Sequence, residues 1–198
     1  MGGSKSKGVD DGKIRFVNSV VLVGPKGVGK KAFMKKFCGQ EYGNCSAQEG
    51  SVELAGGREC GFGIHHLSDL AVCEDFERYV NELCIPFARI FLLAYSVTDR
   101  WSFEEKLPSI RERIVELKKK RSATTEWACI LVGLKCDAEK ERDVAAKEGE
   151  ARARDWDCPF LEVSTLTGTN WTQLFERITL VEASLRAREK TATHKKRR

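Results

Sequence analysis

The strongest constraint on this chain is a glycine-rich loop between a buried-strand pattern and a helical pattern. Residues 24–30, Gly-Pro-Lys-Gly-Val-Gly-Lys, follow the apolar run 20–23 and precede the helix-like segment 32–37. In a G-x-x-x-x-G-K loop, the glycines let successive backbone N–H groups turn toward a phosphate, and the lysine adds a positive charge. The sequence therefore predicts an α/β fold in which a strand, this loop and a helix form a phosphate-binding site.

The residue after this loop departs from the usual pattern. Such loops continue with Ser or Thr, whose hydroxyl binds Mg²⁺, but here the next residue is Lys31. An ammonium group cannot coordinate a cation and repels one, so we expect neither Mg²⁺ nor any other metal in this site. The residues predicted to bind phosphate are Gly24, Lys26, Gly27, Val28, Gly29, Lys30 and Lys31.

Length and composition are those of one soluble globular domain with short tails. The chain has 198 residues, of which 41% are hydrophobic and 32% charged. No apolar run approaches the roughly 20 residues that span a bilayer, and no secretory leader is recognisable. The eight cysteines follow no disulfide framework, so we expect them to stay reduced in a cytosolic compartment.

The two ends of the sequence carry signals for a membrane surface. The start, Met-Gly-Gly-Ser-Lys-Ser, fits the N-myristoylation pattern with Gly2 as the acceptor. From residue 186 onward the charge is +6, which leaves the remainder near −1. One myristoyl chain binds membranes marginally, so a basic second signal is expected. We predict attachment to the cytoplasmic face of a membrane through Gly2 acylation and the basic tail, with a cytoplasmic pool.

Both signals also have simpler interpretations. The start fits a flexible Gly/Ser arm or an expression remnant. The tail fits a solvated end, a nuclear-import signal or a nucleic-acid patch, although nucleic acid is not the partner we expect.

Alternating patterns along the chain predict a mostly parallel six-stranded sheet with helices on both faces. We divide the chain into a flexible arm (1–12), one domain (13–186) and a basic tail (187–198). The strand patterns cover residues 13–23, 51–54, 59–64, 88–95, 129–133 and 160–163. The helical patterns cover residues 32–37, 70–83, 107–117 and 141–156, and a last helix starts near 170. Residues 40–50 are expected to form a polar loop, and Ser102 with Glu105 has the spacing of a capping box.

Four segments together resemble the Ras-like small GTPases. They are the loop at 24–30, Leu-Leu-Ala-Tyr-Ser-Val-Thr-Asp at 92–99, Leu-Val-Gly-Leu-Lys-Cys-Asp at 131–137 and Glu-Val-Ser at 162–164. They follow that family's order and spacing, and the resemblance covers about residues 13–186. It implies a P-loop small-GTPase fold with GTP or GDP as the ligand.

The same resemblance shows where the family's catalytic parts have changed. The family's Asp-x-x-Gly-Gln segment corresponds to residues 66–70, with His66, Asp69 and Leu70 at the three functional positions. The preceding switch loop, at 40–50, is about five residues short. Because metal binding and water positioning supply nearly all catalysis in this reaction class, we expect hydrolysis to be largely lost and assign no catalytic residue.

Base recognition is half retained. The family's Asn-Lys-x-Asp becomes Leu134-Lys135-Cys136-Asp137, and its Ser-Ala-Lys becomes Ser164-Thr165-Leu166. By resemblance, Asp137 accepts the guanine N–H groups, Lys135 packs on the base, and Ser164 and Thr165 shape the pocket. Leu134 lacks the amide that braces the phosphate loop.

Two further clusters receive structural interpretations. Cys60, His65, His66 and Cys73 match no zinc-site spacing, so no metal centre is predicted there. The basic run at 118–121 is expected to be a solvated helix end.

These observations favour a membrane-attached pseudo-GTPase that acts as a signalling or scaffolding adaptor with an unidentified effector. It would bind GTP or GDP weakly or without Mg²⁺. One alternative is a divergent GTP-binding switch with slow hydrolysis. A second is a basic-tailed nuclear or nucleic-acid-associated binding protein.

Overall fold

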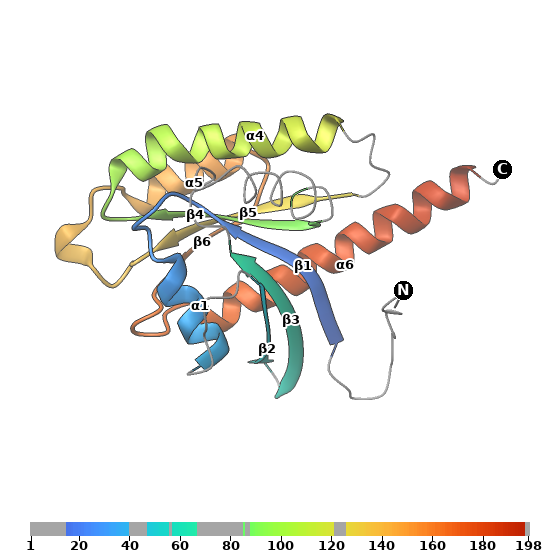
Figure 1. The fold of residues 1–198 in the computed structure, drawn as a ribbon, viewed down its shortest axis with the longest axis horizontal. Coiled ribbons are helices and arrows are strands. Elements are labelled where there is room, and N and C mark those ends of the chain that lie inside the picture. Colours follow the sequence, from blue (N-terminus) through green and yellow to red (C-terminus); the bar gives the residue numbers. More distant parts are fainter. Residues whose placement is uncertain are drawn as a thin grey trace.

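The fold is seen in a computed structural model that describes residues 15–39, 47–55, 57–66, 85, 88–120 and 126–196 (Figure 1). Strands and helices alternate along most of these residues. In chain order they are β1 (Arg15–Val23), α1 (Lys30–Cys38), β2 (Ala47–Leu54), β3 (Arg58–His66), β4 (Ile90–Ser96), η3 (Ser102–Lys106), α4 (Leu107–Lys120), β5 (Ala128–Leu134), η4 (Glu139–Glu141), α5 (Ala146–Asp155), β6 (Phe160–Val163) and α6 (Trp171–Lys196).

The strands form one six-stranded sheet in the order β2-β3-β1-β4-β5-β6. All neighbouring pairs are parallel except β2 and β3, which form the antiparallel hairpin that the sequence predicts. The prediction of a mostly parallel six-stranded sheet is therefore confirmed, and β2 makes the sheet a mixed one. In such sheets ligands bind beyond the carboxyl ends of the parallel strands, which is where the glycine-rich loop follows β1.

Helices cover both faces of the sheet, and this explains the continuous apolar runs in its central strands. In β1, Val20 and Leu22 pack with α1 and α6, whereas Val21 and Val23 pack with α4 and α5. All four are almost fully buried. Burial of such a side chain contributes about 1.5–3 kcal/mol, so these runs fix which strands lie in the centre.

An aromatic cluster joins the helix after the phosphate loop to the last helix. Phe33 of α1 lies 4.8 Å from the Trp171 ring, and Phe37 stacks on Phe175 of α6 at 5.6 Å. Phe62 of β3 meets Phe175 edge-on at 4.9 Å. Because α1 is held against α6 in this way, the start of α1 keeps a fixed position beside the sheet.

Two predicted element boundaries are wrong, and a third predicted element cannot be compared. Residues 47–50, expected in a loop, belong to β2, and residues 40–46 lie outside the described part. The helix expected over 141–156 begins at Ala146, because the preceding residues are extended and bound to the β4 side of the sheet. The helix expected over 70–83 lies outside the described residues.

The expected Ser102 cap is also wrong. The Asp99 carboxylate accepts the backbone N–H of Ser102 at 3.2 Å, so the acceptor at this helix start is Asp99. Ser102 instead donates its hydroxyl to the Asp99 carbonyl and accepts the Ser96 N–H. Ser102 therefore ties this helix start back to the end of β4.

At the end of α4, Lys119 and Lys120 are exposed as expected, but Lys118 is not. Lys118 is buried, and its ammonium donates to the Ala88 carbonyl and lies 5.5 Å from the Phe91 ring centroid. Burial, with a smaller contribution from Arg89, lowers the pKa of Lys118 to about 8. The segment before β4 passes over this lysine, a contact that helical periodicity cannot reveal.

The last helix, α6, is long and continues through residue 186, where we placed the end of the domain. Arg89 forms ion pairs with Glu182 at 3.3 Å and Glu189 at 3.0 Å, which tie the middle of α6 to the start of β4. Beyond these contacts α6 projects away from the sheet (Figure 1). None of the helices in the described part is both long and apolar enough to cross a bilayer.

Candidate functional site

The phosphate loop depends on close backbone approach at its first glycine. A Cβ on Gly24 would lie 2.2 Å from the carbonyl oxygen of Ala94 in β4, so only glycine fits there. Gly27 and Gly29 have φ values of 86° and 116°, in the region that favours glycine. The loop between β1 and α1 therefore has the compact backbone that the sequence motif predicts.

The loop lysine points back into the loop that it follows. Lys30 is only 6% exposed, and its ammonium donates to the carbonyl oxygens of Gly24 and of Pro25, the latter at 2.7 Å. A positive charge is thus held inside the curl of backbone where a phosphate would sit. Val28, which is fully buried, anchors the tip of the loop in the core.

Two more lysines flank this cradle. Lys26 is exposed on the loop, and Lys31 is exposed in the first turn of α1. All seven residues predicted to bind phosphate therefore lie on one continuous segment around the start of α1. Side chains here offer positive charge but no oxygen ligand at position 31, so the loop fits a phosphate chain and does not fit the usual Mg²⁺ site.

The predicted base-binding loop, residues 135–142, begins beside the phosphate loop at the end of β5. Leu134 is buried, and its Cδ1 lies 3.6 Å from the position of a Cβ built on Gly29. An apolar contact thus stands where the family uses an amide. Lys135 is half-buried and has a positive φ of 65°, and Asp137 is exposed.

The second base-side segment is a tight turn organised by Ser164. This residue is fully buried, and its hydroxyl accepts the N–H groups of Thr167 at 2.9 Å and Leu166 at 3.2 Å. Thr165 is partly exposed, and Leu166 is 81% exposed. Ser164 therefore shapes the turn, and Thr165 follows it with part of its side chain exposed.

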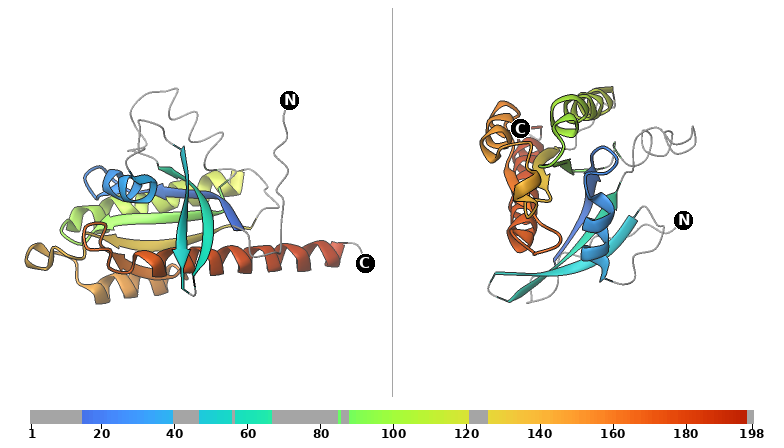
Figure 2. Two further views of the ribbon diagram at one scale, coloured as in Figure 1. Left: turned by 90° about the horizontal axis from the view of Figure 1, so that it is seen from below. Right: turned by 90° about the vertical axis from the view of Figure 1, so that its left-hand side faces the viewer.

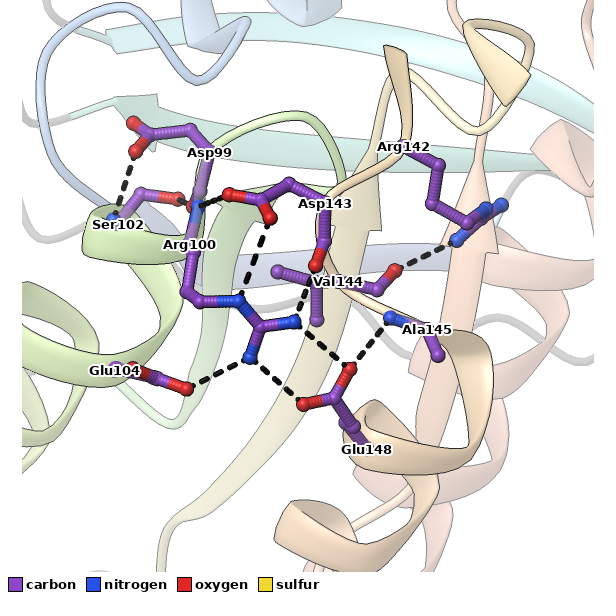
Figure 3. A network of polar contacts seen from close by, with 9 residues as sticks. All are labelled: Asp99, Arg100, Ser102, Glu104, Arg142, Asp143, Val144, Ala145 and Glu148. Carbon is purple, nitrogen blue, oxygen red and sulfur yellow. Dashed lines mark hydrogen bonds and ion pairs between the residues drawn. The ribbon is translucent and has the colours of Figure 1, made fainter. Parts of the chain in front are cut away.

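A polar network beside the base-binding loop was not predicted from the sequence (Figure 3). Its centre is Arg100, which follows β4 and contacts residues 43 and 48 positions away. The guanidinium donates to the Asp143 side chain and carbonyl, to Glu104 at 2.8 Å and to Glu148 at 2.9 and 3.2 Å. The hydrogen bond from Arg100 lowers the pKa of Glu148, and the hydrogen bonds from Glu148 and Glu104 raise the pKa of Arg100.

A second arginine, Arg142, lies at the end of the same loop. Arg142 makes a two-pronged contact with the Glu162 carboxylate at 2.8 and 2.9 Å and donates to the Val144 carbonyl at 3.0 Å. Parallel N–H···O bonds of this kind fix direction as well as charge. The segment leading out of the base-binding loop is thus tied to β6.

Several predicted positions fall at or beyond the limits of the described residues. His66 is the last residue of β3, whereas Asp69, Leu70, Cys73 and Gly2 lie outside. Cys60 is buried in β3. Within the described residues, no group of three or more His, Cys, Asp or Glu side chains could hold a metal ion.

Comparison with known proteins identifies the family. The model of the Ras family matches residues 19–183, so this chain belongs to the Ras-like small GTPases. It is 32% identical over 166 residues to GTP-binding protein RAD of Homo sapiens, over 82% of this chain and 51% of that protein. It is 38% identical over 103 residues to GTP-binding protein Di-Ras2 of Mus musculus, over 52% of this chain and 50% of that protein. The chain thus matches about half the length of these relatives.

Membership of this family supports GTP or GDP as the nucleotide for the site. The Gly24 contact, the curled loop and the enclosed Lys30 ammonium fit its phosphates. The residues that would hold the base are Lys135, Asp137, Ser164 and Thr165, at the ends of β5 and β6.

Proposed function

We propose that this protein is a Ras-like adaptor that binds a guanine nucleotide weakly or without Mg²⁺ and has largely lost GTP hydrolysis. The observation that carries the proposal is Lys31 in the first turn of α1, directly after a well-formed phosphate loop. The fold keeps the parts that bind phosphate and half of those that bind guanine. It lacks a hydroxyl where the metal is normally held.

Loss of the hydroxyl ligand matters more than charge repulsion. Because Lys31 is exposed, its ammonium can swing into solvent, where water and salt screen it. Moving the side chain away does not restore an oxygen for Mg²⁺. With nucleotide present, Lys26, Lys30 and Lys31 can instead neutralise the phosphate oxygens directly.

Hydrolysis is expected to fail for a separate reason. The family's water-positioning Gln corresponds to Leu70, which has no polar atom, and its metal-shell Asp corresponds to His66. Stabilisation of charge and orientation of water supply most of the rate in phosphoryl transfer, so their joint loss removes most turnover.

Nucleotide titration with and without Mg²⁺ tests the nucleotide part of this function. We expect wild-type GDP affinity to be unchanged by Mg²⁺ and to become Mg²⁺-dependent in Lys31→Ser. Lys35→Ser, an exposed lysine one turn further along α1, is the matched control and should behave like wild type. Wild-type binding that requires Mg²⁺, or brisk phosphate release from GTP, would contradict the proposal.

Membrane attachment is the second part of the proposal, supported by where β1 begins and where α6 ends. The start of β1 and the far end of α6 both lie away from the phosphate loop (Figure 2). An acylated Gly2 and the basic tail could therefore reach one surface while the nucleotide site faces the other way. Gly2→Ala should release the expressed protein from membranes to a cytoplasmic pool, and unchanged membrane association would rule this part out.

A slow molecular switch is the alternative function that the base side favours. Asp137 and Ser164 persist, so a protein that binds GTP tightly and turns it over slowly would use the same contacts. Release of bound nucleotide by heating, followed by chromatography, separates the two. GDP recovered from protein supplied only with GTP indicates turnover.

A further inference from the structure

We propose that Arg100 is a positioning residue for the base-binding loop, holding its returning end so that Asp137 faces a guanine. This inference rests on the proposed function for its nucleotide readout. The contacts that hold the loop are present in the protein without a nucleotide, so they can be tested separately.

Both ends of the base-binding loop are hydrogen-bonded to the backbone of Val97. The Val97 N–H donates to the Leu134 carbonyl at 3.0 Å, where the loop begins. The Val97 carbonyl accepts the N–H groups of Asp143 at 2.8 Å and Val144 at 2.9 Å, where the loop ends. Residues 135–142, which include Lys135 and Asp137, therefore leave and rejoin the sheet at a single residue.

Arg100 binds the residues at the returning end of this loop (Figure 3). Its backbone N–H donates to Asp143 Oδ2 at 3.1 Å, and its side chain reaches Asp143 Oδ1 and the Asp143 carbonyl. The same guanidinium reaches both oxygens of Glu148 in α5. One planar group thus joins the end of β4, the returning end of the loop and the first turn of α5.

This chain needs such a contact because the side chain of Leu134 offers no hydrogen bond. In its place Leu134 packs against Gly29, and an apolar contact sets a distance without fixing an orientation. A guanidinium fork fixes both, because its N–H groups lie in one plane and meet separate oxygens. Arg100 is therefore suited to restore the orientation that the family obtains from an amide.

A purely structural ion pair is the competing explanation. Arg100 is well exposed, at 38% of its side chain, and exposed ion pairs contribute little to global stability. If the network only supported the fold, its loss would change amide exchange throughout the domain or would leave it unchanged everywhere. If it positions the loop, its loss should loosen residues 135–144 and leave the rest of the sheet unchanged.

The experiment compares Arg100→Ala and Arg100→Lys with wild type and with Arg113→Ala. Arg113 is an equally exposed arginine in α4 with a 3.6 Å ion pair to Glu116. The first readout is amide hydrogen exchange in nucleotide-free protein at Ala138, Asp143 and Val144. The Leu131 N–H, bonded to the Pro159 carbonyl, is the internal reference. The second is affinity for GDP and for inorganic tripolyphosphate.

In Arg100→Ala we expect about tenfold faster exchange at the three loop amides, with Leu131 unchanged. GDP affinity should fall about tenfold while tripolyphosphate affinity is unchanged, because the phosphate loop keeps its own contacts. Lysine cannot span Asp143 and Glu148 with a planar fork, so Arg100→Lys should recover less than half of either loss. Arg113→Ala should change none of these quantities.

Equal exchange in wild type and Arg100→Ala, or equal acceleration at the loop and at Leu131, would overturn the inference. Full recovery by Arg100→Lys would do so as well, since charge alone would then suffice. Absence of GDP binding by wild type would count against the proposed function, and the exchange data would still decide the role of Arg100. If Arg100→Ala does not fold, Glu148→Gln and Asp143→Asn provide the same comparison with smaller changes.

Discussion

The two halves of the nucleotide site are held together by different forces. On the phosphate side, steric contacts define the loop: Gly24 lies against the Ala94 backbone, and Val28 is buried. On the base side, partly exposed charges do so: in the segment that follows Asp137, Asp143 pairs with Arg100 and Arg142 pairs with Glu162 of β6. Close packing changes little with solvent conditions, whereas exposed ion pairs weaken with salt and acid.

This difference matches what the sequence has kept and what it has lost. The phosphate loop keeps its glycines and has Lys31 at the position where the family pattern has Ser or Thr. The base-binding loop follows Leu134, which stands where the family pattern has Asn, and has an arginine network beside it. The two halves should therefore respond differently to substitution, salt and pH.

The largest expected effect is on the phosphate side, from Gly24→Ala. The new Cβ would meet the Ala94 carbonyl at 2.2 Å, and the backbone of a central strand cannot easily move. We expect a loss of about 3 kcal/mol in the free energy of unfolding, measured by urea denaturation. Gly27→Ala is the control, because its Cβ meets nothing within 4 Å and only its positive φ is unfavourable, which costs about 1 kcal/mol. Equal losses would mean that the close approach is unimportant.

An intermediate effect is expected on the base side, from Arg142→Ala. Arg142 and Glu162 are 17% and 13% exposed, so their pair lies between buried pairs and surface pairs. Removal leaves a mostly buried carboxylate without its partner, and we expect a loss of about 2 kcal/mol. The same denaturation series with Arg113→Ala should show less than about 0.5 kcal/mol. A similar result for both arginines would remove the distinction between the network and an ordinary surface pair.

The smallest expected effect is the pH dependence of the Glu148 contact. The hydrogen bond from Arg100 lowers the pKa of Glu148 in the folded protein. Its stabilisation is therefore complete above about pH 5 and is lost as the pH falls through the lowered pKa. We expect the stability difference between wild type and Glu148→Gln to shrink with acidification. A difference that stays constant from pH 7 to pH 3 would show that the Glu148 charge is not used.

Local sequence patterns predicted most of the fold. Buried runs identified β1, β4 and β5, the turn before Arg58 identified the β2–β3 hairpin, and the glycine spacing identified the phosphate loop. These elements are encoded by neighbouring residues, so a single sequence contains the information. Membership of the Ras family confirms the resemblance on which the site assignment depends.

The features that were missed depend on contacts between distant residues. Arg100 belongs to no motif, and its partners Asp143 and Glu148 lie in another element. The late start of α5 has the same origin, because bonds to Val97 keep the residues before Ala146 extended. Lys118 looked like a solvated helix end because nothing nearby in the sequence reveals the carbonyl that it meets.

The length of α6 has a mechanical consequence. With 26 residues at a rise of 1.5 Å each, this helix is about 39 Å long, and the Arg89–Glu189 ion pair joins it to the residue before β4. The part of α6 beyond Glu189 is a rigid helical extension, held to the rest of the domain at Arg89. A force or tilt applied at its far end would be transmitted to the start of β4, and through that strand to the residues around Val97 at its other end.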